Sequence, residues 1–366
     1  MFLFVTRNFP PDIGGIQSLM GGLSHSISDY GPVTVFADNH AESPNYDKNS
    51  QINIHRIGGI KLLRKYRKAN LVNDFITKNR NIRAVFFDHW KSLDSINIKN
   101  SENLKVFCLI HSKEINHEIN SSLNKRLIKN INYVDYIIAN SHFTKKLAIS
   151  VGIKENKIKI IFPGINKPKE ISEKFMSEAN SIFGDAFPKI LTIARLDKRK
   201  GHDNILMSIR NLKIKFPKIK YVSVGSGNEE KNLIKLSNEL SLTNEVIFLN
   251  KINENLKLSL IKKSNLFIMP SRIEGRSVEG FGISFIEAGS YGVGSIGGKD
   301  GGSSDAIMDN KSGILCDGND LGSIYDSINQ FFENDNYLKY GKAAKDFSEK
   351  FYWEKTIKKY LELLES

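Results

Sequence analysis

The sequence predicts an α/β protein made of two Rossmann-like domains, each with a doubly wound parallel sheet. Two observations support this: short apolar runs alternate with amphipathic stretches, and the alternation occurs once in each half of the chain. Such runs are typical of strands that are buried on both faces. The expected strands of the first half are residues 2–5, 33–36, 84–87, 106–110 and 136–139. Those of the second half are 189–194, 221–225, 245–249 and 266–270, with short elements at 294–298 and 313–316.

The segments between these runs have helical spacing, as in residues 17–27 and 125–134. A chain of 366 residues is long enough for two domains of ordinary size. We expect the linker between Gly164 and Asp185, where Pro168, polar residues and a helical stretch separate the two series of strands. Two doubly wound domains are expected to face a central cleft at the carboxyl ends of their strands, with a nucleotide on one side and an acceptor on the other.

Composition narrows the class of protein. The two cysteines, Cys108 and Cys316, are far apart, which favours a reducing cytoplasm over a disulfide scaffold or a zinc site. The first apolar run ends at Arg7 and is too short for a signal peptide, so it predicts a strand. We expect a soluble or peripheral protein, because no apolar stretch approaches the ~18 residues that a membrane span needs. The net charge of +13 fits nucleotide phosphates, anionic lipids or nucleic acid, or a general Lys bias of the genome.

The strongest motif lies at residues 269–292, after an expected strand. Its Glu279 and Glu287 are separated by seven residues, and a helix is expected to begin near Gly282. The backbone N–H groups of Gly282, Ile283 and Ser284 would then form an anion site. A diphosphate bound there would have Glu287 near a ribose and Glu279 near a sugar. The alternative is a glycine-rich turn with a solvated glutamate at each end.

A basic segment at residues 194–203 directly follows another expected strand. Arg195 and Lys200 are candidates to neutralise the phosphates of a departing nucleotide diphosphate, which gains charge as the glycosidic bond breaks. The alternative is an ordinary basic loop, since Lys198 and Arg199 are charged as well.

Three places in the first half also carry candidate residues. Gly14 and Gly15 open a predicted helix, where they either admit a ligand to its N–H groups or form a tight turn. His111 follows a predicted strand and is either catalytic or structural. Asn140 and Ser141 end the neighbouring strand and either line an acceptor pocket or, for Ser141, cap the next helix.

Together these motifs resemble retaining glycosyltransferase family 4, whose members have the GT-B fold. Residues 279–287 match the family's E-x7-E signature and residues 195–201 its diphosphate-binding motif. Residues 14–16, His111, 140–144 and 301–307 follow in the expected order, and residues 269–289 resemble members that act on phosphoinositide or glycerolipid acceptors. The resemblance implies a first, acceptor-binding domain of residues 1–165 plus a C-terminal helix, 347–366, and a donor-binding domain of residues 166–346.

The resemblance also implies roles for individual residues. Arg195 and Lys200 would bind the donor diphosphate, Glu287 the ribose, and His111 the transferred sugar. The residues that would hold the sugar and phosphates are Glu279, Phe281, Gly282, Ile283 and Ser284, with Gly15 on the donor side, and the base would lie at Asn250–Ile252. Glu274 is not chosen, because its spacing to Glu287 does not fit the signature. The implied reaction retains the anomeric configuration by front-face displacement, needs no metal, and uses a UDP-sugar such as UDP-glucose.

The acceptor is expected at a membrane. Residues 57–72 predict a basic, partly amphipathic helix with Lys61, Arg64, Lys65, Arg67 and Lys68, suited to the anionic inner face of the cytoplasmic membrane. Lys125, Arg126 and Lys129 would extend this patch. The expected acceptor is a lipid such as diacylglycerol or a lipid-linked glycan.

Several alternatives to this expectation stay open. The basic helix is otherwise a solvated helix of a Lys-rich protein, and the acceptor could be soluble or a polysaccharide. A non-enzymatic nucleic-acid-binding protein is disfavoured because no nucleic-acid motif is present. A sugar-nucleotide epimerase lacks recognisable acid–base residues here.

Overall fold

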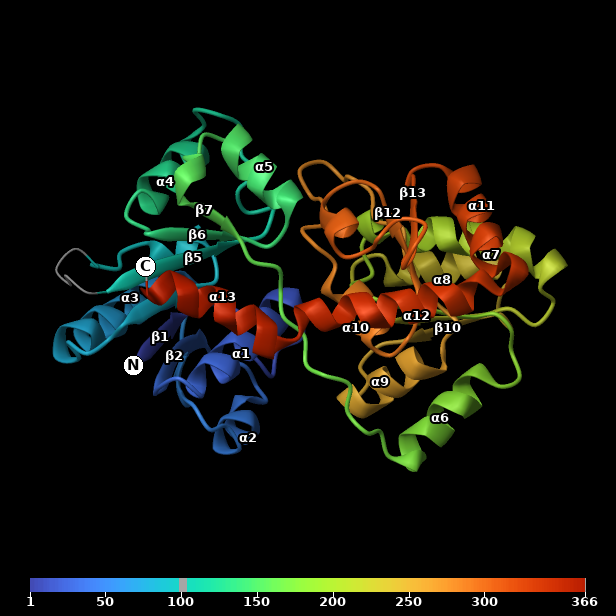
Figure 1. Ribbon diagram of the computed structural model, residues 1–366, viewed down its shortest axis with the longest axis horizontal. Helices are drawn as coiled ribbons and strands as arrows, with labels where there is room; N and C mark the ends of the chain where they lie inside the picture. The colour runs from blue at the N-terminus through green and yellow to red at the C-terminus, as the bar shows by residue number, and fades with distance from the viewer. Residues whose placement is uncertain (99–103, 366) are drawn as a thin grey trace. The chain divides into compact units, whose positions relative to one another are not determined.

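The computed structural model describes residues 1–98 and 104–365. The chain divides into two compact units (Figure 1). The first consists of Met1–Asn166 and Phe351–Ser366, and the second of Lys167–Lys350. No helix in the described residues is both long enough and apolar enough to cross a bilayer.

The first unit is built on a parallel seven-stranded sheet with the order β3-β2-β1-β4-β5-β6-β7. Its strands are β1 (Phe2–Val5), β2 (Val33–Asp38), β3 (Asn53–Ile57), β4 (Ala84–Phe87), β5 (Lys105–Ile110), β6 (Tyr136–Ala139) and β7 (Ile158–Ile160). The strand order reverses between β1 and β4, where Val5 pairs with Phe87. This reversal is the topological switch point at which open α/β sheets bind ligands.

Helices cover both faces of this sheet. They are α1 (Gly15–Ser28), α2 (Ser43–Lys48), α3 (Lys61–Lys78), α4 (Ser122–Ile131), α5 (His142–Ser150) and α13 (Trp353–Glu365). Apolar side chains of α3, α4 and α5 form one core with the sheet, and those of α1 and α13 form the other. The C-terminal helix α13 lies beside α1 (Figure 1), and its Tyr360 ring contacts Phe86 and Phe107.

The second unit has a parallel six-stranded sheet with the order β10-β9-β8-β11-β12-β13. Its strands are β8 (Lys189–Ile193), β9 (Lys220–Val224), β10 (Val246–Leu249), β11 (Leu266–Met269), β12 (Ser295–Gly298) and β13 (Gly313–Cys316). Its helices are α6 (Glu173–Phe183), α7 (His202–Lys215), α8 (Glu230–Glu239), α9 (Glu254–Lys263), α10 (Ile283–Ser290), α11 (Leu321–Phe332) and α12 (Asn336–Ser348). Here the switch point lies between β8 and β11.

The prediction of two doubly wound α/β domains is confirmed. Two strands were not predicted, β3 and β7, because both lie at sheet edges and do not form continuous apolar runs. The linker is shorter than expected, since α6 lies within the predicted linker but packs on α9 of the second unit. Residues 347–350, expected in the terminal helix of the first domain, count with the second unit.

Candidate active site

The strongest cluster of charged side chains in the second unit lies where β8 and β11 end. Residues 194–201 follow β8 and include the short 3-10 helix η3 (Lys198–Lys200), and residues 270–282 follow β11 and lead into α10. Both predicted motifs therefore meet at the switch point of this sheet. They do so because carboxyl ends of neighbouring parallel strands lie at the same edge of a sheet.

Glu279 is the centre of this cluster. Its Oε2 accepts hydrogen bonds from Lys200 Nζ at 2.5 Å and from Arg199 Nη1 at 2.8 Å, and Ser271 Oγ lies 3.4 Å away. All three charged side chains are largely buried, with exposures of 10–12%. Burial raises the pKa of Glu279, but the charges of Lys200 and Arg199 outweigh it and lower the pKa to about 2. The Glu279 carboxylate is thus ionised and pairs with the two cationic side chains, Lys200 and Arg199.

The cluster has a net positive charge in a partly desolvated place, which favours a bound anion. Glu279 compensates one of its two cationic partners, so one positive charge remains. Burial lowers the pKa of Lys200, while Glu279 opposes that shift. Arranged in this way, the Lys200 ammonium is held in one place by the carboxylate and Met269 Sδ, 3.2 Å away.

Close backbone approaches fix the two loops to each other. Gly201 has a φ of +75°, and a Cβ there would lie 2.6 Å from Pro270 O. Arg272 also joins the loops, since its N–H donates to Arg199 O and its side chain pairs with Asp203 at 2.7 Å. The position of Glu279 relative to Lys200 is therefore set by the backbone as well as by the ion pair.

Helix α10 begins as the sequence predicted. Gly282 is its N-cap residue, with a φ of +94° and no side-chain cap, which leaves the first N–H groups of the helix available to an anion. Ser284 Oγ donates to Ile193 O at 3.3 Å and so holds this end of the helix near the end of β8. Phe281 is buried directly before the cap.

Glu287 lies one turn further along α10 and has a partner that the sequence did not indicate. Its Oε1 accepts a hydrogen bond from Lys257 Nζ of α9 at 3.0 Å. Burial lowers the pKa of Lys257, but Glu287 and Glu254 more than offset this and raise it overall. Lys257 lies on the first turn of α9, which follows the loop holding Asn250 and Ile252. Of these two, Asn250 is exposed and donates to Glu230 Oε1 at 2.7 Å.

Arg195 differs from the other motif residues because its side chain is 73% exposed and pairs with Asp197, at 3.1 Å. The structure therefore brings Lys200 and Glu279 into contact, whereas Arg195 projects from the same loop into solvent.

The predicted residues of the first unit lie at the carboxyl ends of its strands. Gly14 is the N-cap of α1 and Gly15 its first residue. His111 follows β5, and its Nε2 lies 2.8 Å from Asp88 O. Ser141 caps α5 by accepting a hydrogen bond from Thr144 N at 2.9 Å, while the Oδ1 of Asn140 is buried and has no partner within the described residues.

The predicted basic patch needs a correction at Lys68. This residue is buried, with its ammonium donating to Thr6 O at 2.5 Å and pairing with Asp38, so it cannot face a membrane. Arg64 is also half-buried against Asp38, at 3.3 Å. Exposed basic side chains remain at Lys61, Lys65 and Arg67.

Three further residues belong to the candidate site but were not singled out from the sequence. Arg199 was visible as a charge, but only the fold shows that it, and not Arg195, contacts Glu279. Lys257 is distant in sequence from Glu287, and no spacing rule links the two. His202 follows Gly201 and donates through Nε2 to Arg195 O, 3.2 Å away. This hydrogen bond stabilises the loop of residues 194–201.

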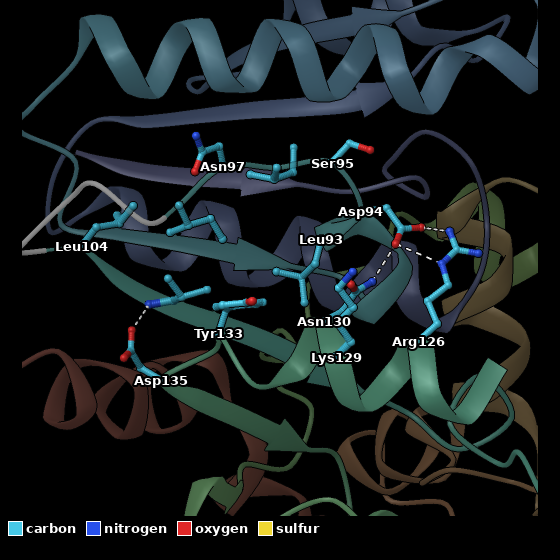
Figure 2. Close-up of a pocket in the computed structure, with 13 residues that line it drawn as sticks. Leu93, Asp94, Ser95, Asn97, Leu104, Arg126, Lys129, Asn130, Tyr133 and Asp135 are labelled. Atoms are coloured by element: carbon cyan, nitrogen blue, oxygen red, sulfur yellow. Dashed lines mark hydrogen bonds and ion pairs between the residues drawn. The ribbon is translucent and has the colours of Figure 1, made fainter. Parts of the chain in front are cut away.

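A separate cavity of about 580 Å³ lies in the first unit beside α4 and the start of β5 (Figure 2). Asp94 on its wall accepts hydrogen bonds from Arg126 and Asn130, at 3.2 and 2.6 Å. None of the predicted donor or acceptor residues lines it. Within residues 1–98 and 104–365, no group of three or more His, Cys, Asp or Glu side chains is arranged to hold a metal ion.

Comparisons with known proteins identify the family of the chain. A family model described as "Glycosyl transferases group 1" matches residues 174–350, and one described as "Glycosyltransferase Family 4" matches residues 13–167. The chain is 24% identical, over 89% of its length and 87% of the relative's, to a GDP-mannose-dependent alpha-(1-6)-phosphatidylinositol monomannoside mannosyltransferase of Mycolicibacterium smegmatis. It is 26% identical, over 91% of its length and 88% of the relative's, to a GDP-mannose-dependent monoacylated alpha-(1-6)-phosphatidylinositol monomannoside mannosyltransferase of Corynebacterium glutamicum.

Solved structures share the fold. The Anabaena HepE protein in complex with UDP superposes with a TM-score of 0.82 at 18% identity, covering 100% of this chain and 99% of that one. The sucrose-phosphate synthase of Thermosynechococcus elongatus gives a TM-score of 0.79 at 18% identity, covering 99% and 97%.

Proposed function

The chain belongs to glycosyltransferase family 4 and is an enzyme that takes its sugar from a nucleotide-sugar; from this premise we propose that it transfers a hexose to the headgroup of a membrane lipid. The observation that carries the donor half of the proposal is the buried Glu279–Lys200–Arg199 cluster beside the uncapped start of α10. A buried cationic group next to free helix N–H groups is suited to a diphosphate.

We assign the donor-site roles as follows. Lys200 and Arg199 neutralise the diphosphate as it leaves, and the N–H groups of Ile283 and Ser284 bind its oxygens. Arg195, which is exposed and lightly paired, closes over the phosphates from the solvent side. Glu279 holds the cations and contacts the sugar.

Glu287 and the adjacent loop hold the nucleoside in this proposal. Glu287, paired with Lys257, accepts hydrogen bonds from the ribose hydroxyls. The backbone at Asn250–Ile252 contacts the base, and His111 contacts the transferred sugar. Anomeric configuration is retained by front-face attack, in which a donor phosphate oxygen accepts the proton of the acceptor hydroxyl.

The donor base is the point on which the sequence expectation and the relatives differ. A UDP-sugar such as UDP-glucose was expected, whereas both curated relatives described above are named for GDP-mannose. We propose GDP-mannose as the first donor to test. UDP-glucose is the matched alternative.

The acceptor half rests on the relatives' phosphatidylinositol-based substrates and on the first turns of α3. Exposed apolar side chains gather there beside the exposed basic residues; they are Ile60, Leu62, Leu63 and Tyr66. Basic and apolar groups on one exposed helix end favour a peripheral position on an anionic membrane. We place the enzyme at the inner face of the cytoplasmic membrane.

The test measures release of GDP or UDP from a panel of nucleotide-sugars, with and without vesicles that contain phosphatidylinositol or diacylglycerol. We expect release from GDP-mannose that depends on the lipid. Release that is independent of vesicles would indicate a soluble acceptor, and no release together with no nucleotide binding would overturn the proposal.

Charge reversal separates the membrane contact from the chemistry. The triple variant Lys61→Glu, Lys65→Glu and Arg67→Glu should lose vesicle binding in a flotation assay, because each cation near an anionic surface contributes about 1 kcal/mol. The matched control reverses Lys231, Lys342 and Lys345, exposed residues of the second unit. Equal vesicle binding by the two variants would remove α3 from the membrane contact.

A further inference from the structure

The switch point of the first unit holds a pair of side chains that neither the motifs nor the family resemblance singled out. Arg7 and His89 follow β1 and β4, each two residues beyond the paired Val5 and Phe87. Asp88 joins the two strand ends: it accepts hydrogen bonds from Arg7 N and Thr6 Oγ1, both at 2.9 Å, and from Ser92 Oγ at 2.6 Å. Asp88 is completely buried. The backbone that carries Arg7 and His89 is therefore fixed by Asp88 at the carboxyl ends of β1 and β4.

The hydrogen bonds of His89 determine which of its ring nitrogens carries the proton. Nδ1 accepts a hydrogen bond from Lys91 N at 3.1 Å, because His89 is the N-cap of the 3-10 helix η1 (Trp90–Leu93). A nitrogen that accepts carries no proton, so the proton of the ring is on Nε2. His89 is 6% exposed, and its Nε2–H is therefore a nearly buried donor.

This donor faces another donor. Arg7 Nη1 lies 3.5 Å from His89 Nε2, and a guanidinium nitrogen cannot accept a hydrogen bond. No acceptor for the Nε2–H of His89 is present within residues 1–98 and 104–365. Two converging N–H donors, one of them charged, leave a place that an oxyanion would satisfy from both sides.

We propose that Arg7 and His89 bind a phosphate group in the headgroup of the acceptor, an inference that rests on the proposed lipid glycosyltransferase function. A phosphate oxygen between the two nitrogens accepts from both, and the fixed charge of Arg7 compensates it. The site is adjacent to the sugar-transfer residue, since His111 Nε2 donates to Asp88 O at 2.8 Å. Lys68, another cation at this end of the sheet, is already paired with Asp38 and Thr6 O.

The acceptor is the source we assign, because the donor diphosphate has its own cations in Lys200 and Arg199. A phosphate at Arg7 and His89 would orient a phosphate-bearing headgroup relative to His111. The pair would then select for phospholipid acceptors over neutral lipids of similar shape.

The first experiment titrates inorganic phosphate into the full-length protein and follows the histidine side chains by long-range ¹H–¹⁵N correlation spectra. We expect His89 to be the Nε2–H tautomer and its signals to shift with phosphate. Arg7→Gln should weaken this binding at least tenfold. Arg83→Gln is the matched control, because Arg83 is exposed and directly precedes β4, at the amino ends of the strands. This variant should leave phosphate binding unchanged.

A second variant separates capping from anion binding. His89→Asn keeps an N-cap acceptor for Lys91 N but removes the Nε2–H donor, so η1 should persist while phosphate binding falls. An Nδ1–H tautomer of His89, or phosphate shifts that persist in Arg7→Gln, would overturn the site.

The second experiment compares acceptors. Arg7→Gln should lower the ratio of kcat/KM for phosphatidylinositol over kcat/KM for diacylglycerol at least tenfold, while Arg83→Gln leaves the ratio unchanged. Weakened GDP binding in Arg7→Gln, with an unchanged acceptor ratio, would assign the anion to the donor and refute the proposal. Phosphate binding at His89 in a protein that transfers sugar to neither lipid would keep the anion site but refute both its assignment to a lipid acceptor and the proposed function.

Discussion

The two switch points of this protein hold the same kinds of charged group in opposite states. In the second unit Lys200 and Arg199 are buried against Glu279, so the cations have a partner before any ligand arrives. In the first unit Arg7 faces the donor of His89, and the nearby carboxylate of Asp88 is occupied by a backbone amide and two hydroxyl groups. The comparison supports our proposal of a preassembled donor site in the second unit and an acceptor site in the first unit that its ligand completes.

The largest effect is expected from removing the partner in the second unit. Glu279→Gln leaves Lys200 and Arg199 buried without a carboxylate, which costs about 3–5 kcal/mol of stability. Turnover should fall on the order of a hundredfold or more, because the cations lose their fixed positions. Steady-state kinetics and urea unfolding followed by circular dichroism measure both effects.

The matched control for that variant is Glu274→Gln. Glu274 is exposed in the same loop, and its backbone exchanges two hydrogen bonds with Ser277. It should change stability by less than about 0.5 kcal/mol. Equal losses in the two variants would mean that Glu279 is not the carboxylate that organises the site.

The same comparison explains what the sequence allowed us to predict. In the second unit the important residues lie in two short motifs directly after strands, so Lys200, Glu279 and the start of α10 at Gly282 could be read from local order. Arg199 was set aside because a charge in a basic loop looks the same whether it is solvated or buried. Its contact with Glu279 spans 80 positions and depends on the pairing of β8 with β11.

In the first unit the residues of the candidate sites are scattered along the sequence, and the burial of Lys68 changed the interpretation of the basic patch. Lys68 looked like one of five equivalent basic residues, but the rotation of α3 turns it toward Asp38. Arg7 and His89 are isolated in the sequence, 82 positions apart, and become a pair only because β1 and β4 are neighbours in the sheet. The tautomer of His89 depends on its capping contact with Lys91 N, which neither composition nor spacing reveals.

A second test compares two histidines that have the same tautomer. His202 donates through Nε2 to Arg195 O at 3.2 Å, so its donor is satisfied, unlike that of His89. Burial lowers the pKa of His202 to about 4, although the Arg195 carbonyl opposes the shift. Since the folded pKa is below the ordinary value of 6.5, this contribution to stability is complete above about pH 6.5 and is lost as the pH falls toward 4.

The expected loss from His202 is about 2 kcal/mol between pH 7 and pH 5. His202→Gln keeps an Nε2 donor but does not titrate, so its unfolding free energy should fall less over this range. Both tryptophans, Trp90 and Trp353, belong to the first unit. A urea transition that appears in circular dichroism but not in tryptophan fluorescence therefore reports the second unit. Equal pH slopes in the two proteins would contradict the assignment.

The smallest expected effect is the one that tests the comparison most directly. Arg199→Gln should destabilise the second unit by about 2 kcal/mol, because it removes a buried hydrogen bond to an ionised Glu279. Arg7→Gln should change the stability of the first unit by less than about 0.5 kcal/mol, because the exposed Arg7 side chain faces a donor and pairs with no carboxylate within residues 1–98 and 104–365. The backbone N–H of Arg7, which holds Asp88, is present in both proteins. Tryptophan fluorescence during urea unfolding measures the first unit. A loss in Arg7→Gln as large as that in Arg199→Gln would mean that Arg7 already has a partner in the free protein, and the two switch points would then be alike.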